Sequence, residues 1–179
     1  MASKEFLIAE QKTKQTNTTE AIPLTHAAYI WSDDFSNAST WEFGHASSCD
    51  LDWEIGVGLE NEGNYPTPTI NSTTAADGYA MLDADEYINT QPNDVISSWM
   101  TTASPINLSA NPNVILQFET QYRPLNSKCF VVTSTNNTDW PELNVNFDAS
   151  TNENVYELFQ EVDNHDLVSN SSTLIELNI

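Results

Sequence analysis

From Ala28 onward, short apolar runs rich in aromatic and β-branched residues alternate with clusters of Asn, Asp, Gly, Pro and Ser. This pattern is typical of an all-β domain. It predicts strands over residues 29–35, 53–56, 79–82, 95–101, 114–122, 128–133, 143–147, 155–159 and 173–179. No helical period persists over three turns, although residues 155–162 are compatible with a helical turn as well as with a strand. We therefore expect an antiparallel β-sandwich whose sheets pack face to face.

For two of the predicted strands, the alternation of side chains along a strand shows which residues share a face. In the opening strand, Trp31, Asp33 and Phe35 are expected on one face and Asp34 on the other, because successive strand residues point to opposite sides. The run 114–123 alternates in the same way. Its two faces carry Phe118, Thr120 and Tyr122, and Glu119, Gln121 and Arg123.

The chain divides into a polar N-terminal extension or linker, residues 1–27, and one domain, residues 28–179. A chain of 179 residues is long enough for one domain with a sizeable core. No run of about 18 apolar residues predicts a transmembrane helix. The N-terminus lacks the apolar region of a signal peptide, yet Asn, Ser and Thr are abundant and Lys is scarce. We therefore expect a secreted or surface protein whose signal is missing from this chain.

The charge balance is strongly acidic, with 26 Asp and Glu against 5 Lys and Arg and a net charge of -21. Such a chain repels a phosphate backbone and an anionic membrane, so nucleic acid and membrane insertion are not expected. The acids suit a hard cation such as calcium, or they only keep the surface soluble. Asn-x-Ser/Thr sequons, the acceptor motif for N-glycosylation, begin at Asn17, Asn37, Asn71, Asn107, Asn136 and Asn170. In a chain so rich in Asn, Ser and Thr, several of these motifs are expected by chance.

Two cysteines, Cys49 and Cys129, are far apart in the sequence. They are either bridged, which would stabilise the fold by about 4 kcal/mol, or buried thiols. Neither they nor the three histidines have the spacing of a zinc site, and no motif indicates a Ser-His-Asp set.

A family resemblance rests on the order of several motifs. These are "WSDDFSNASTW", "DWEIGVG", "TTAADGYAMLDADEY", "SSWMTTASPINLS", "VILQFETQYRPLNSKCFVVTSTNNTDW" and "STLIELNI". Over about residues 29–179, the chain resembles the MAM-like and cleaved-adhesin-like jelly-roll domains of secreted Bacteroidetes proteins, often called choice-of-anchor domains. The resemblance implies a jelly-roll sandwich of the concanavalin A-like or galactose-binding-like type. It also implies a secreted accessory module, found in adhesins and beside peptidases and carbohydrate-active enzymes, and often exported by the type IX system.

The sequence departs from that family pattern at two places, the last strand and the turn before Trp140. The chain stops at "LNI", where the family continues into a last strand, so we expect another segment or a neighbouring chain to complete the sheet. The usual Asp-Gly turn before Trp140 is replaced by "NNTD", and Asn and Asp tolerate the left-handed conformation that a tight turn needs.

Calcium is the metal that the resemblance implies, held by an acid at the end of the first strand and a partner acid near the last one. Asp34 is the expected ligand, with its neighbour Asp33 as the second candidate, and a solvated strand end is the alternative. The loop "DADEYINTQPND" places Asp83 and Asp85 at positions 1 and 3 of an EF-hand count, but Ile88 stands where that loop needs Gly. An EF-hand is therefore excluded, and a loosely bound calcium or a solvated acidic loop remains.

Catalysis has one candidate, the run "DLDWE" with Asp50, Asp52 and Glu54. On a strand these carboxylates share a face, as the acids of jelly-roll glycosidases do. Positions four apart are about 13 Å apart at Cα, whereas a retaining pair of carboxyls needs about 5 Å. A strand with a wet acidic face is therefore the preferred interpretation.

Ligand binding has a different candidate, Trp140 with its neighbour Asp139. Trp140 follows a polar loop and precedes a proline, so it is expected to be exposed, whereas most tryptophans of a sandwich lie in the core. We expect a non-catalytic adhesion or recognition module for carbohydrate or a cell-surface protein. The alternatives are a glycoside hydrolase that uses Asp50 to Glu54, and a structural subunit that accepts a strand from a neighbour.

Overall fold

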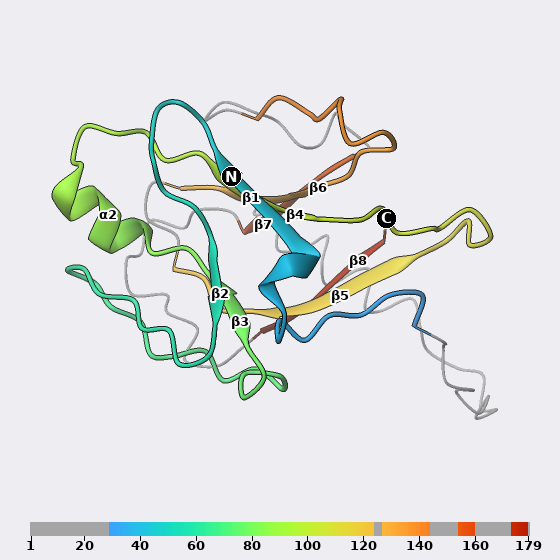
Figure 1. Ribbon diagram of the computed structural model, residues 1–179, viewed down its shortest axis with the longest axis horizontal. Coiled ribbons are helices and arrows are strands. Elements are labelled where there is room, and N and C mark those ends of the chain that lie inside the picture. Colours follow the sequence, from blue (N-terminus) through green and yellow to red (C-terminus); the bar gives the residue numbers. More distant parts are fainter. Residues whose placement is uncertain (1–28, 124–126, 144–153, 160–172, 179) are drawn as a thin grey trace, which may run out of the picture.

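The computed structural model of the chain describes residues 29–123, 127–143, 154–159 and 173–178 (Figure 1). Strands dominate the secondary structure of these residues, and there is little helix. In chain order, the elements are η1 (Ala38–Thr40), β1 (Trp41–His45), β2 (Glu54–Gly56), β3 (Tyr79–Met81), α2 (Ala84–Thr90), β4 (Ser98–Thr102), β5 (Ile115–Thr120), β6 (Cys129–Val132), β7 (Val155–Phe159) and β8 (Thr173–Asn178).

The described strands form four antiparallel pairs, β1 with β4, β2 with β3, β5 with β8, and β6 with β7. The pairs are nested along the chain, because β2 and β3 both lie between β1 and β4, and β6 and β7 both lie between β5 and β8. β5 and β8, with six residues each, are the longest of these strands. The strand pairs confirm the expectation of an antiparallel, mainly β protein.

The segment 29–35, predicted as the opening strand, is not a strand. The backbone N–H of Phe35 donates to Asp33 Oδ1 at 2.7 Å, and that of Ser36 donates to Asp34 Oδ1 at 3.0 Å. Carboxylates that capture a nearby N–H compete with the hydrogen bonds of a strand ladder. Phe35 adopts the left-handed conformation, with φ 61°. The strand prediction is therefore wrong, and the expected alternation of faces along this segment does not exist.

The first strand among the described residues is β1, which the apolar pattern missed because charged and small residues interrupt it. The ring of Trp41 packs edge-to-face on Trp31, with centroids 5.8 Å apart, and stacks on Phe35 at 5.4 Å. On the other face of the pair, Gly44 lies opposite Trp99. A Cβ at residue 44 would lie 2.8 Å from the Trp99 ring, so this glycine makes room for the indole.

Alternate polar side chains of β5 and of the residues after it hold the long β2–β3 loop, residues 57–78. These side chains are Glu119, Gln121 and Arg123. The Glu119 carboxylate accepts from the N–H of Thr73 at 2.7 Å. The Gln121 amide donates to the carbonyl of Pro68 at 2.9 Å, and the Arg123 guanidinium donates to that of Tyr65 at 3.0 Å. The predicted polar face is therefore correct, but it binds a loop rather than water alone.

Helix α2 occupies the start of the segment that was predicted as an acidic loop, so that prediction is wrong for residues 84–90. Asp83 caps the helix and accepts from the N–H of Glu86 at 3.0 Å. The same carboxylate accepts from the N–H of Glu62 at 2.7 Å, and the Glu86 carboxylate accepts from that of Gly63 at 3.1 Å. Acids are favourable in the first turn of a helix, because the N-terminal N–H groups carry partial positive charge.

The buried apolar side chains among the described residues are Cys49, Tyr79 and Val155, which are 3%, 6% and 4% exposed. Burial, together with the nearby charge of Glu60, raises the pKa of Tyr79, and its hydroxyl donates to the carbonyl of Leu59. The predicted strand 143–147 lies outside the described residues except for Leu143. Within the described ranges, no helix has the length and apolar character needed to cross a membrane.

Candidate functional site

A tight turn precedes Trp140. Asn136 Oδ1 accepts from the N–H groups of Thr138 at 3.0 Å and Asp139 at 2.9 Å. The hydroxyl of Ser134 accepts from the N–H of Asn137 at 3.2 Å. Asn137 has φ 55°, the left-handed conformation that Asn tolerates. The "NNTD" sequence therefore forms the turn that was expected of it.

A paired strand end supports this turn. β6 ends at Val132 and β7 begins at Val155, and these two residues are opposite each other. Just beyond them, the N–H of Thr133 donates to the carbonyl of Asn154 at 3.1 Å. Val155 is only 4% exposed, so the strand next to the turn is anchored in the core.

Between the turn and β7 lies a pocket of about 360 Å³. Hydroxyl, amide and carboxylate groups line it, together with one indole and one proline ring. The lining residues are Thr133, Ser134, Thr135, Asn136, Asp139, Trp140, Pro141 and Asn154. Trp140 is 39% exposed. The structure thus places Trp140 and Asp139, the two predicted ligand-binding residues, in the wall of the same pocket.

Asp139 is held in place within that wall. The side-chain amide of Asn136 donates to Asp139 Oδ2 at 2.6 Å. Among the lining residues that the structure describes, Asp139 is the only one with an acidic or basic side chain. A pocket with an aromatic face, fixed hydrogen-bonding groups and a single negative charge suits a neutral ligand that carries many hydroxyl groups.

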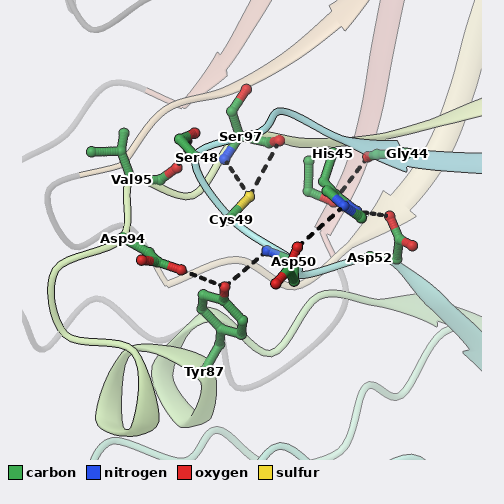
Figure 2. Close-up of polar contacts among 11 residues, drawn as sticks. Gly44, His45, Ser48, Cys49, Asp50, Asp52, Tyr87, Asp94, Val95 and Ser97 are labelled. Carbon is green, nitrogen blue, oxygen red and sulfur yellow. Dashed lines mark hydrogen bonds and ion pairs between the residues drawn. The ribbon is translucent and has the colours of Figure 1, made fainter.

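The acids of residues 50–54 have a different arrangement from the predicted one. β2 begins at Glu54, so Asp50 and Asp52 precede the strand and the three do not form a row along it. Asp50 and Asp52 instead flank His45, the last residue of β1 (Figure 2). His45 Nδ1 lies 2.8 Å from Asp52 Oδ1, and Nε2 lies 3.8 Å from Asp50 Oδ1. This His–Asp group was missed because His45 and Asp52 are seven positions apart and match no short motif.

A second hydrogen-bond chain fixes the backbone of Asp50. Its N–H donates to the hydroxyl of Tyr87 at 2.8 Å, and this hydroxyl donates to Asp94 Oδ2 at 2.6 Å (Figure 2). The hydrogen bond to Asp94 raises the pKa of Tyr87, and nearby carboxylate charge contributes in the same direction. Helix α2 and the end of the turn after it are thereby attached to the segment that carries Asp50.

The residues predicted for calcium serve as hydrogen-bond acceptors. Both carboxylate oxygens of Asp33 accept hydrogen bonds, from the Phe35 N–H and from the Thr40 hydroxyl at 2.9 Å. Ser36, through its hydroxyl and its N–H, lowers the pKa of Asp34. Asp83 and Asp85, for their part, accept N–H groups of the β2–β3 loop. In the described part of the chain, no three His, Cys, Asp or Glu side chains converge as a metal site would require.

The two cysteines are free thiols. Cys49 is 3% exposed, and its sulfur accepts from the N–H of Ser97 at 3.4 Å. Burial raises the pKa of Cys129 to about 11. Of the two alternatives left open by the sequence, the structure therefore contains free thiols and not the bridge, with Cys49 buried and Cys129 half-buried.

Comparisons of this chain with protein-family models, with curated proteins and with solved structures found no match.

Proposed function

We propose that this protein is a non-catalytic, extracellular recognition module that binds a neutral carbohydrate in the pocket beside Trp140. The observation that carries the proposal is the joint presence of Trp140 and Asp139 in one pocket lined by hydroxyl and amide groups. The exposed indole supplies a flat apolar surface for the C–H face of a sugar ring, and the polar lining supplies partners for its hydroxyls.

The charge of the protein narrows the ligand class. The net charge is -21, and the pocket contributes the carboxylate of Asp139. Acidic glycans would be repelled both at the pocket and over the whole surface. Neutral hexose or pentose polymers are therefore the proposed ligands, either free or on a cell-surface protein.

A jelly-roll sandwich is the proposed complete architecture. Eight-stranded jelly rolls contain two Greek keys, and in each key the fourth strand lies beside the first and the third beside the second. The pairs β1–β4 and β2–β3 are two of the contacts of such a key, and β5–β8 and β6–β7 are the same two contacts of a second one. A Greek key also places its first and second strands side by side, and no such pair occurs among the described strands. The support for a jelly roll is therefore the order of motifs that resembles the secreted jelly-roll domains.

The binding proposal is tested by isothermal titration of the full chain with neutral oligosaccharides, including β-glucan, xylan, mannan and galactan fragments, and with acidic ones for comparison. We expect one neutral class to bind and the acidic ones not to bind. Trp140→Ala and Asp139→Asn are each expected to weaken binding about tenfold, which corresponds to about 1.4 kcal/mol for a lost stacking or charged hydrogen bond.

Trp99→Ala is the matched control, since this indole is 48% exposed but lies outside the pocket. It should leave the affinity unchanged. Failure of every saccharide to bind at millimolar concentration, or full binding by Trp140→Ala, would overturn the proposal.

Structural calcium stays a prediction of the family resemblance. The measurement that checks it is the melting temperature in EGTA and in millimolar calcium, because a ligand that binds only the folded state must raise it. An unchanged melting temperature would remove calcium from the description of this domain.

A role as a strand-accepting structural subunit is the second candidate, because each described strand has only one hydrogen-bonded neighbour. A strand with an open edge accepts another chain readily. This candidate predicts concentration-dependent association of the purified chain, whereas a monomer at all concentrations in sedimentation experiments would contradict it. Hydrolysis of β-glucans that Glu54→Gln abolishes would replace both candidates with the glycosidase alternative.

A further inference from the structure

The imidazole of His45 is held between two carboxylates that lie on different ring nitrogens. Asp52 Oδ1 is 2.8 Å from Nδ1, a normal hydrogen-bond distance, so Asp52 orients the ring. Asp50 Oδ1 is 3.8 Å from Nε2, too far for a hydrogen bond. His45 is 31% exposed and Asp50 is 97% exposed at the side chain, so solvent reaches the space between these two atoms.

The separation of 3.8 Å between Asp50 Oδ1 and His45 Nε2 is a few tenths of an ångström longer than the distance between two ligand atoms of one tetrahedral zinc ion. Zinc binds an imidazole nitrogen and a carboxylate oxygen at about 2.0–2.2 Å each, which places the two ligand atoms about 3.3–3.6 Å apart. The exposed Asp50 carboxylate can close this small difference. Metal-binding histidines almost always donate their second ring N–H to a carboxylate, which fixes the tautomer and makes the ligating nitrogen more basic. Asp52 has this position relative to His45.

The backbone that carries Asp50 is fixed without any ion. Its N–H binds the hydroxyl of Tyr87, which in turn is bound to Asp94. The preceding residue, Cys49, is buried, and its sulfur accepts a hydrogen bond from the N–H of Ser97. Binding therefore requires the ordering of one exposed carboxylate and not of a whole loop.

We infer that His45 Nε2 and Asp50 Oδ1 form a two-ligand surface site for a borderline divalent metal ion such as Zn²⁺, with Asp52 as the positioning residue and water in the remaining coordination positions. Imidazole with carboxylate suits zinc, copper and nickel better than calcium. Two protein ligands make this an exchangeable site. The site is independent of the carbohydrate pocket.

The test is a titration of the full-length chain with ZnCl₂ at pH 7.4 in a buffer that does not chelate zinc, followed by calorimetry and by long-range ¹H–¹⁵N spectra of the histidine rings. We expect the His45 Nε2 resonance to shift while Nδ1 keeps its proton. His45→Gln should abolish the tightest binding event. Asp50→Asn should weaken it at least tenfold, and Asp52→Asn about tenfold, through the loss of ring orientation.

Glu54→Gln is the charge-matched control, because it removes one exposed carboxylate close in sequence without touching either ligand. It should change the affinity less than twofold. Equal losses in Glu54→Gln and Asp50→Asn would show that zinc is attracted only by the general negative charge and would overturn the inference. So would unchanged affinity in His45→Gln. If a variant does not fold, the ring spectra of the wild-type chain decide, since a His45 ring unaffected by zinc rules out the site.

Discussion

The guanidinium of Arg123 lies over the ring of Tyr65, 5.2 Å from its centroid, and also donates a hydrogen bond to the carbonyl oxygen of the same residue at 3.0 Å. These two contacts attach the long β2–β3 loop to the end of β5, between residues 58 positions apart in the sequence. Both partners are on the surface, so each contact is of moderate strength.

Arg123→Ala should lower the free energy of unfolding by about 2–4 kcal/mol, the sum of an exposed cation–π contact and a charged hydrogen bond. Arg123→Lys should recover only part of this, because lysine keeps the charge but loses the planar donor group. Urea denaturation measures both values. Limited proteolysis should show faster cleavage within residues 57–78 of the alanine variant, and an unchanged cleavage pattern would mean that the loop is held elsewhere.

Gly63 and Gly58 provide a matched pair of backbone probes in the same loop. Both have positive φ, 71° and 68°. A Cβ at Gly63 would lie 2.4 Å from Asp85 Oδ2 and 2.9 Å from its backbone carbon, whereas nothing lies within 4 Å of a Cβ at Gly58. Gly58→Ala should cost about 1 kcal/mol, the strain of a left-handed alanine.

Gly63→Ala should cost clearly more, about 2–4 kcal/mol, because the new methyl group also displaces the Asp85 carboxylate from the loop. Thermal and urea unfolding of the two variants check the difference. Equal losses would show that the contact between the loop and helix α2 is not tight in solution.

Asp33 and Asp34 should differ in their contribution to stability despite their adjacency. Asp33 accepts two hydrogen bonds, so Asp33→Ala should cost about 1–2 kcal/mol, and Asp34→Ala, at a fully exposed position, should cost less. The pKa of Asp34 is lowered in the folded state, so its contribution is present above pH 4 and is lost as the pH falls through the folded pKa. The stability difference between wild type and Asp34→Asn should therefore be constant above about pH 4 and should shrink as the pH falls below it. A difference that stays unchanged down to about pH 2 in acid titrations would contradict this assignment.

Cys129 should make stability decrease in alkaline solution. Burial raises its folded pKa from 9.0 to about 11, so the unfolded chain ionises first as the pH rises. The contribution is complete below pH 9 and is lost between pH 9 and 11, by about 2–3 kcal/mol for a shift of this size. Cys129→Ala should remove this part of the pH dependence, which urea denaturation of both proteins at pH 8 and pH 10.5 measures. Identical pH slopes would show that the thiol is exposed.

The polar and apolar alternation along 114–123 was sufficient to predict β5 and its faces, because a strand's side chains alternate whatever it packs against. The same rule failed at residues 29–35. There, Asp33 and Asp34 bind N–H groups two residues ahead, and such local bonds are made in preference to a ladder when no partner strand is aligned. Helix α2 was not predicted for a related reason. A seven-residue helix is stabilised by its Asp83 cap and by its contacts with the β2–β3 loop, so it has no apolar stripe that a sequence pattern could reveal.

The sequence by itself determined the β-rich character of the domain and its strong acidity, and it led to the prediction that Trp140 and Asp139 bind a ligand. These follow from composition and local order, which do not depend on long-range contacts. Only the tertiary structure decided that Trp140 and Asp139 share a pocket with Asn154, that the cysteines are thiols, and that His45 lies between Asp50 and Asp52. Each of these depends on which strand ends meet in space, and strand pairing between distant segments is decided by packing that no local pattern records.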